Sequence, residues 1–154
     1  MGIASPIPDG YAGAIPYLTV HDGVRALEFY QQAFGAVEIM RMADPKGRIG
    51  HAEFKIGNQI IMLSDEHPEM GVVSPKTLGG TPCALMFYFQ DVDAVVEQAV
   101  AAGAKIVRPV ANQFYGDRSG KLEDPFGHIW WVATHIEDVS PEEMQRRAAA
   151  LYGA

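Results

Sequence analysis

Apolar and polar residues follow a regular order along this chain. A β-rich run at residues 15–20 precedes GVRALEFYQQAF, residues 23–34, whose apolar side chains recur at helical spacing. Asp22 is a suitable N-cap for this helix and Gly35 a suitable C-cap. Strand patterns follow at residues 36–42, 48–56 and 59–65. The first part of the chain therefore predicts one strand, one helix and three strands.

The same order returns in the second part of the chain. A strand pattern at residues 84–89 precedes a helix that runs from Asp91 to Gly103. Asp91 follows Asp22 by 69 residues, and Gly103 follows Gly35 by 68 residues. Further strands are expected at 104–110 and 128–135, with a loop and hairpin centred on DRSGK between them. A repeat of this length predicts two copies of one structural unit.

We therefore predict an α+β fold of two tandem βαβββ halves, residues 14–66 and 82–136, within one domain of residues 1–154. One helix per half covers one face of its sheet and leaves the other open, so that the two sheets would form a cup. The Gly- and Pro-rich segment between the halves is expected to be a loop. Pro141 after Ser140 predicts an appended helix over residues 140–152.

Charge and composition narrow the class of protein. The formal charge of −7 opposes binding to nucleic acid, and no stretch approaches the roughly 20 apolar residues of a membrane span. The single cysteine, Cys83, forms no internal disulfide, and the first residues lack a secretory pattern. These features predict a cytoplasmic protein that binds neither nucleic acid nor membrane.

Three segments resemble the vicinal oxygen chelate superfamily, which includes glyoxalase I, bleomycin-resistance proteins and extradiol dioxygenases. They are LTVHD with ALEFYQQAFG in residues 18–35, FQDVDAVVEQAVAAGA in residues 89–104, and EDPFGHIWWV in residues 123–132. The resemblance covers residues 14–136, and in detail the chain is similar to the glyoxalase-like branch of this superfamily. It implies the cup-shaped fold and a homodimer.

The resemblance also implies where a metal would be bound. Metal-dependent members carry His in the first strand of each half and Glu in the last strand, and the corresponding positions here are Ile15, Ile61, Ala84 and Trp131. None of these side chains is a donor for a divalent cation. A shift of the last strand by four residues would use His135, but such shifts break the repeat register. We therefore expect no metal and no other cofactor.

Strand alternation from those positions predicts the open face of the cup. The expected ligand-binding residues are Tyr17, Thr19, Gln59, Ile61, Met86, Tyr88 and Trp131, with Phe114, Tyr115 and Arg118 from the loop at 111–119. Leu63 and His135 share the expected face. The aromatic faces would stack on a planar ligand, and Arg118 would pair with an anionic group on it. Alternatively, Asp117 and Arg118 only hold their hairpin together.

Three functions are compatible with this pattern. The first is metal-free binding of an aromatic or cationic compound, as in antibiotic resistance of the bleomycin type. The second is a lyase or isomerase, either metal-dependent or using His51 and Glu53 as an acid–base pair. The third is an oligomeric module whose cavity is filled by aromatic side chains such as Trp131. We favour the first, with a small molecule and a second copy of the chain as the partners.

Overall fold

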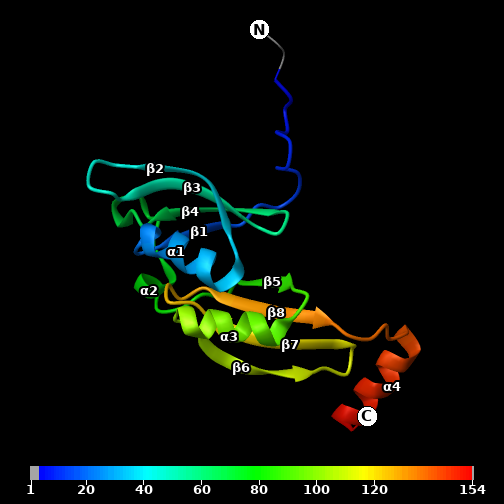
Figure 1. Ribbon diagram of the computed structural model, residues 1–154. Helices are drawn as coiled ribbons and strands as arrows, with labels where there is room; N and C mark the ends of the chain where they lie inside the picture. Colours follow the sequence, from blue (N-terminus) through cyan, green and yellow to red (C-terminus); the bar gives the residue numbers. More distant parts are fainter. Residues whose placement is uncertain (1–3, 154) are drawn as a thin grey trace. The chain divides into compact units, whose positions relative to one another are not determined.

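The computed structural model describes residues 4–153, which form two compact units that divide between Gly80 and Thr81. Each unit contains one four-stranded sheet of mixed parallel and antiparallel strands. Figure 1 shows α1 across the sheet of the first unit and α3 across the sheet of the second. The α+β fold and its repeated unit are confirmed, and each unit is described by itself below.

The first unit contains β1 (Tyr17–Val20), α1 (Gly23–Phe34), β2 (Val37–Ala43), β3 (Ile49–Ile56) and β4 (Gln59–Asp65). Its sheet, the first sheet, has the strand order β1-β4-β3-β2. Only the β1–β4 pair is parallel. Helix α1 carries the chain from β1 to β2 at the opposite edge of the sheet, and two hairpins then bring β3 and β4 back toward β1.

Helix α1 begins and ends as the sequence predicts. The side chain of Asp22 accepts a hydrogen bond from the Arg25 amide, and Gly35 ends the helix with a φ of 66°. The apolar stripe of α1 packs on the sheet, where Tyr30 stacks on Phe54 with ring centroids 5.1 Å apart. This contact fixes which face of the first sheet is covered.

The second unit contains β5 (Ala84–Tyr88), α3 (Val92–Ala102), β6 (Lys105–Asn112), β7 (Asp117–Glu123) and β8 (Ile129–His135). Its sheet, the second sheet, has the equivalent order β5-β8-β7-β6. Trp130 is buried on the face that α3 covers, 5.9 Å from the ring of Phe87, and its indole N–H donates to Asp124 at 2.9 Å.

Two segments differ from the sequence prediction. The segment that joins the units contains a 3-10 turn, Pro68–Met70, and one short helix, α2 (Pro75–Leu78), each begun by a proline. DRSGK is not a hairpin loop but part of strand β7. The turn lies before this strand, and in it the Gly116 amide donates a hydrogen bond to the Gln113 carbonyl. The polar residues of this strand concealed its alternation.

Helix α4 (Pro141–Tyr152) starts after its Ser140 cap as predicted.

Candidate functional site

The strand register assigns each side chain of the first sheet to the face covered by α1 or to the opposite, open face. On β1 and β3 the alternation places Tyr17, Thr19, His51 and Glu53 on the open face, as predicted. On β4 the prediction was wrong by one residue. Ile61 pairs with Phe54 and Leu63 pairs with Leu18, so both lie under α1 and are buried.

The open face of β4 consists instead of Ile60, Met62 and Ser64. Gln59 pairs with Ile56 of the covered face, and its side-chain amide turns back to the Ile60 carbonyl. The error has a physical cause. Apolar residues occupy four successive positions of β4, so alternation identifies no face, and the register was set by distance from the turn glycine alone.

Three residues on the open face of the first sheet and Tyr11 of the N-terminal segment form a hydrogen-bonded chain, here called the Glu53 network. The Tyr17 hydroxyl lies 2.7 Å from Nδ1 of His51, and Nε2 of His51 lies 3.0 Å from Oε1 of Glu53. The second carboxylate oxygen accepts a hydrogen bond from the Tyr11 hydroxyl. The pair of His51 and Glu53 is therefore in contact on the face where it was expected.

The Glu53 network has defined protonation states. Hydrogen bonds from Tyr11 and then from His51 lower the pKa of Glu53, although burial acts in the opposite direction. The bond to Glu53 raises the pKa of Tyr11, and burial, followed by the Glu53 charge, raises the pKa of Tyr17. At neutral pH the network thus holds one carboxylate and two protonated phenols.

The open face of the second sheet carries Met86, Tyr88 and Trp131, as the alternation predicted. Met86 and Tyr88 are 46% and 58% exposed, so both side chains are accessible from solvent. The Trp131 ring has the Arg108 guanidinium 5.6 Å and the Lys121 ammonium 5.5 Å from its centroid. Cations of the chain itself therefore already lie over the aromatic face that a cationic ligand would use.

A second hydrogen-bonded cluster, here called the Asp117 network, lies at the end of this open face. The Tyr88 hydroxyl donates to Oδ2 of Asp117 at 2.6 Å, and Nδ1 of His135 lies 2.8 Å from Oδ1. Nε2 of His135 lies 2.9 Å from Oδ1 of Asp138. Asp117, and after it Asp138, raises the pKa of His135 above its ordinary value. In the protonated form, which this raised pKa favours, both ring nitrogens are donors, and Asp117 is the acceptor at the centre of the cluster.

A pocket of about 510 Å³ lies at the carboxyl ends of β5 and β8, beside the Asp117 network. It is lined by Tyr88, Phe89, Gln90, Thr134 and His135. The volume is that of a small-molecule site, with aromatic walls and a few polar groups.

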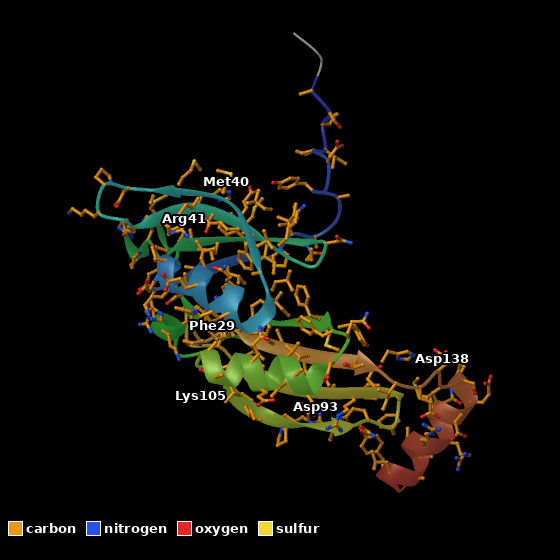
Figure 2. The ribbon with its side chains drawn as sticks, viewed as in Figure 1. Phe29, Met40, Arg41, Asp93, Lys105 and Asp138 are labelled. Atoms are coloured by element: carbon orange, nitrogen blue, oxygen red, sulfur yellow. The ribbon has the colours of Figure 1, made fainter. Side chains whose placement is uncertain are left out.

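The expected loop residues have different positions. Arg118 lies on the covered face of β7, paired with Thr134, and its guanidinium makes two hydrogen bonds to Asp93 of α3 at 2.6 and 2.7 Å. The prediction that Arg118 belongs to a loop at 111–119 is therefore wrong, because this residue lies in strand β7. Figure 2 labels Asp93 on α3. The ring of Phe114 contacts Tyr152 of α4, whereas the Tyr115 hydroxyl lies 3.5 Å from Ser119 of the open face.

The residues present do not fit the metal site of the resembled superfamily. Ile15, Ala84 and Trp131 supply no donor, and Ile61 lies on the covered face. The open-face neighbours on β4 offer only the Met62 thioether and the Ser64 hydroxyl, which suit hard divalent cations poorly. Within residues 4–153, no cluster of three or more His, Cys, Asp and Glu side chains is arranged to hold a metal ion.

The sequence pattern did not identify Tyr11 and Asp138, and it placed Asp117 in the wrong element. Tyr11 lies in an N-terminal segment without a regular pattern, and only its contact with Glu53 reveals its role. Asp117 was expected in a loop, whereas DRSGKLE forms strand β7, in which Asp117 faces the same way as Ser119. Asp138 follows the last strand, where no pattern relates it to His135.

The chain belongs to the Glyoxalase/Bleomycin resistance protein/Dioxygenase superfamily, whose family model matches residues 12–132. An uncharacterized protein of Mycobacterium bovis is 39% identical over 133 residues, which are 84% of this chain and 88% of that protein.

Solved structures show the same fold. TioX from Micromonospora is 28% identical with a TM-score of 0.62, over 80% of this chain and all of that chain. A fosfomycin resistance protein from Listeria monocytogenes, FosX, crystallised with Mn(II) and sulfate, is 22% identical with a TM-score of 0.62, over 89% of this chain and 98% of that one. None of the helices in residues 4–153 has the length and hydrophobicity that a membrane span requires.

Proposed function

We propose that this protein binds a small organic molecule with an aromatic or planar apolar body, and that binding requires no metal ion. The observation that carries the proposal is the pocket of about 510 Å³ bordered by Tyr88, Phe89 and His135. The absence of donor side chains at the positions of the family's metal ligands supports the metal-free part.

The state of the side chains favours binding over catalysis. In each hydrogen-bonded network the carboxylate already has two partners, and the pKa of Tyr17 is raised, so the exposed phenol retains its proton. The phenol hydroxyls are thus held in fixed positions with their protons engaged in the networks. The exposed Met86 and Tyr88 offer apolar area to a ligand. In the cell, such a protein would give antibiotic resistance by sequestering the compound that it binds.

A binding screen tests the proposal directly. The ¹⁵N-labelled protein in EDTA is titrated with neutral, cationic and anionic aromatic compounds, and amide shifts are followed by NMR. We expect shifts at Thr134 and His135 and their loss in Tyr88→Ala. Tyr152→Ala is the matched control, because Tyr152 is an exposed tyrosine that does not line the pocket. No shift at the pocket with any compound, or equal losses in both variants, would refute the proposal.

The Glu53 network supports a second candidate, a metal-free lyase or isomerase. The Tyr17 proton would move to Nδ1 of His51, Glu53 would stabilise the imidazolium, and the Tyr17 oxygen would accept a proton from a substrate carbon. The raised pKa of Tyr17 opposes this step, which makes it the second choice.

Deuterium exchange distinguishes the two candidates. Carbonyl compounds with acidic C–H bonds are incubated with the protein in ²H₂O, and deuterium incorporation is followed by NMR. An enzyme of this kind would exchange them, and Tyr17→Phe and His51→Gln would abolish exchange while His135→Gln would not. Exchange that is unchanged in His51→Gln, or absent with every compound, would remove the catalytic candidate.

A cytoplasmic homodimer is part of the proposal. Strand β2 lies at an edge of the first sheet and exposes Val37, Ile39, Met40 and Met42, a surface that an isolated protein would rarely leave to water. Sedimentation equilibrium is expected to give twice the chain mass, and Met42→Lys is expected to shift it toward the monomer. A monomer in the wild type would contradict this part.

A further inference from the structure

The imidazole of His135 has one buried and one exposed partner. On one side it meets Asp117, whose side chain is 7% exposed and held by the Tyr88 hydroxyl. On the other side it meets Asp138, whose side chain is fully exposed. Figure 2 shows Asp138 just beyond β8, on the segment that leads to α4. The Asp117 contact is thus fixed by its surroundings, whereas the Asp138 contact is open to competition from solvent and solutes.

His135 forms part of the wall of the pocket, whereas Asp117 and Asp138 do not. His135 and Tyr88 both line it, and Phe89 adds a second aromatic ring. A carboxylate that replaced Asp138 would keep Nε2–H bonded to an anion and would leave the charge around the imidazolium unchanged. A ring attached to that carboxylate would reach the aromatic wall of the same pocket.

We propose that the pocket at the ends of β5 and β8 binds an aromatic carboxylate, whose anionic group displaces Asp138 from His135 while its ring packs against Tyr88 and Phe89. The inference rests on the proposed function and gives its ligand a chemical class. Asp138 then occupies the anion position when no ligand is bound. Arg108 and Lys121 over Trp131 extend the cationic character of the same open face.

Binding depends on the charge of His135. The titratable groups that face it are Asp117 from β7 and Asp138 from the segment after β8, with Tyr88 from β5 bound to the far side of Asp117. The charge of Tyr115, from the turn before β7, contributes to raising the pKa of Tyr88. The two carboxylates raise the pKa of His135 and so favour its protonated form, and affinity is expected to fall as the pH rises through that raised pKa.

The test uses benzoate, benzylamine and benzyl alcohol, three probes with one ring and different charge. Calorimetry and NMR at pH 6.5 are expected to show benzoate binding most tightly. Asp138→Asn is expected to tighten benzoate about two- to five-fold, because it removes an exposed competing ion pair. His135→Gln is expected to weaken benzoate about ten-fold or more, because it removes a charge-assisted hydrogen bond.

Glu97→Gln is the control for Asp138→Asn, since it removes the same charge from an exposed site on α3 outside the pocket. Equal effects of the two variants, or benzylamine or benzyl alcohol binding as tightly as benzoate, would overturn the inference. If benzoate does not bind but other aromatic compounds shift the pocket resonances, only this inference fails. If no aromatic compound binds there, the proposed function fails with it.

Discussion

Nδ1 of His135 lies 2.8 Å from Oδ1 of Asp117, its direct cross-strand neighbour in the second sheet. This contact joins the last two strands of the fold at the edge of the pocket. It also links the charge of His135 to a carboxylate that the protein largely buries. The protonation of His135 is therefore the most accessible reporter of the candidate site.

We predict that His135 titrates above 6.5, the ordinary value for histidine, because Asp117 and then Asp138 accept its N–H groups. The folded-state pKa exceeds the unfolded one, so this contribution to stability is complete below about pH 6.5 and is lost as the pH rises through the folded-state value. Asp117→Asn should lower the pKa in an NMR titration, and Asp93→Asn should not. A His135 pKa at or below 6.5 in the wild type would contradict this.

Tyr11 is predicted to control the ionisation of Glu53. Its hydroxyl is the largest cause of the lowered Glu53 pKa, so Tyr11→Phe should raise that pKa, as measured by ¹³C NMR of the carboxyl group. Tyr17→Phe should have a smaller effect, because Tyr17 bonds to His51 rather than to Glu53. The depressed pKa stabilises the fold above the unfolded value near 4.5, and this contribution is lost as the pH falls through the folded-state pKa. Equal shifts in both variants would argue against the assignment.

Gly23 begins α1 in close contact with Ile49 of β3. A β-carbon at Gly23 would lie 2.8 Å from Cγ1 of Ile49, and the Gly23 amide is bound to Asp65 at 2.7 Å. Gly23→Ala is therefore expected to lower the free energy of unfolding by about 1–3 kcal/mol in urea denaturation. Gly50→Ala, where the nearest atom would be 3.8 Å away, should cost much less. A loss no larger than that of the control would show that the close contact is relieved without cost.

Asp124 and Asp44 begin two turns of similar sequence, DPFG and DPKG, in different surroundings. Buried Asp124 accepts hydrogen bonds from the amides of Phe126 and His128 and from the Trp130 indole, each at 2.9 Å. Exposed Asp44 accepts hydrogen bonds from the amides of Lys46 and Arg48 in its own turn. Asp124→Ala should lower the free energy of unfolding by at least about 2 kcal/mol, because it leaves buried donors unsatisfied. Asp44→Ala should lower it less, and the opposite order would refute this reasoning.

The sequence predicts the helix ends and the alternating strands better than it predicts the strand faces without alternation and the contacts of the site. Helices α1, α3 and α4 start and end where their caps predict, because Asp22, Asp91 and Ser140 each accept an amide hydrogen bond from the first turn. Strand faces were predictable where polar and apolar residues alternate, as at His51 and Glu53. They were not predictable on β4, where Ile60 to Leu63 are all apolar.

Long-range hydrogen bonds were the least predictable feature. The contact of Tyr11 with Glu53 spans 42 positions, and Tyr88 reaches Asp117 across 29. Composition and periodicity carry no information about such pairs. The structure was needed to separate Arg118, which binds Asp93 on the covered face, from the open-face residues beside it.

Native mass spectrometry before and after addition of Mn²⁺, Ni²⁺ or Zn²⁺ tests metal-free binding most directly. We expect the bare polypeptide mass, or that mass with an organic adduct, under every condition. One stoichiometric metal ion per chain that survives desalting would contradict it and would make a metal-dependent lyase or isomerase the leading interpretation.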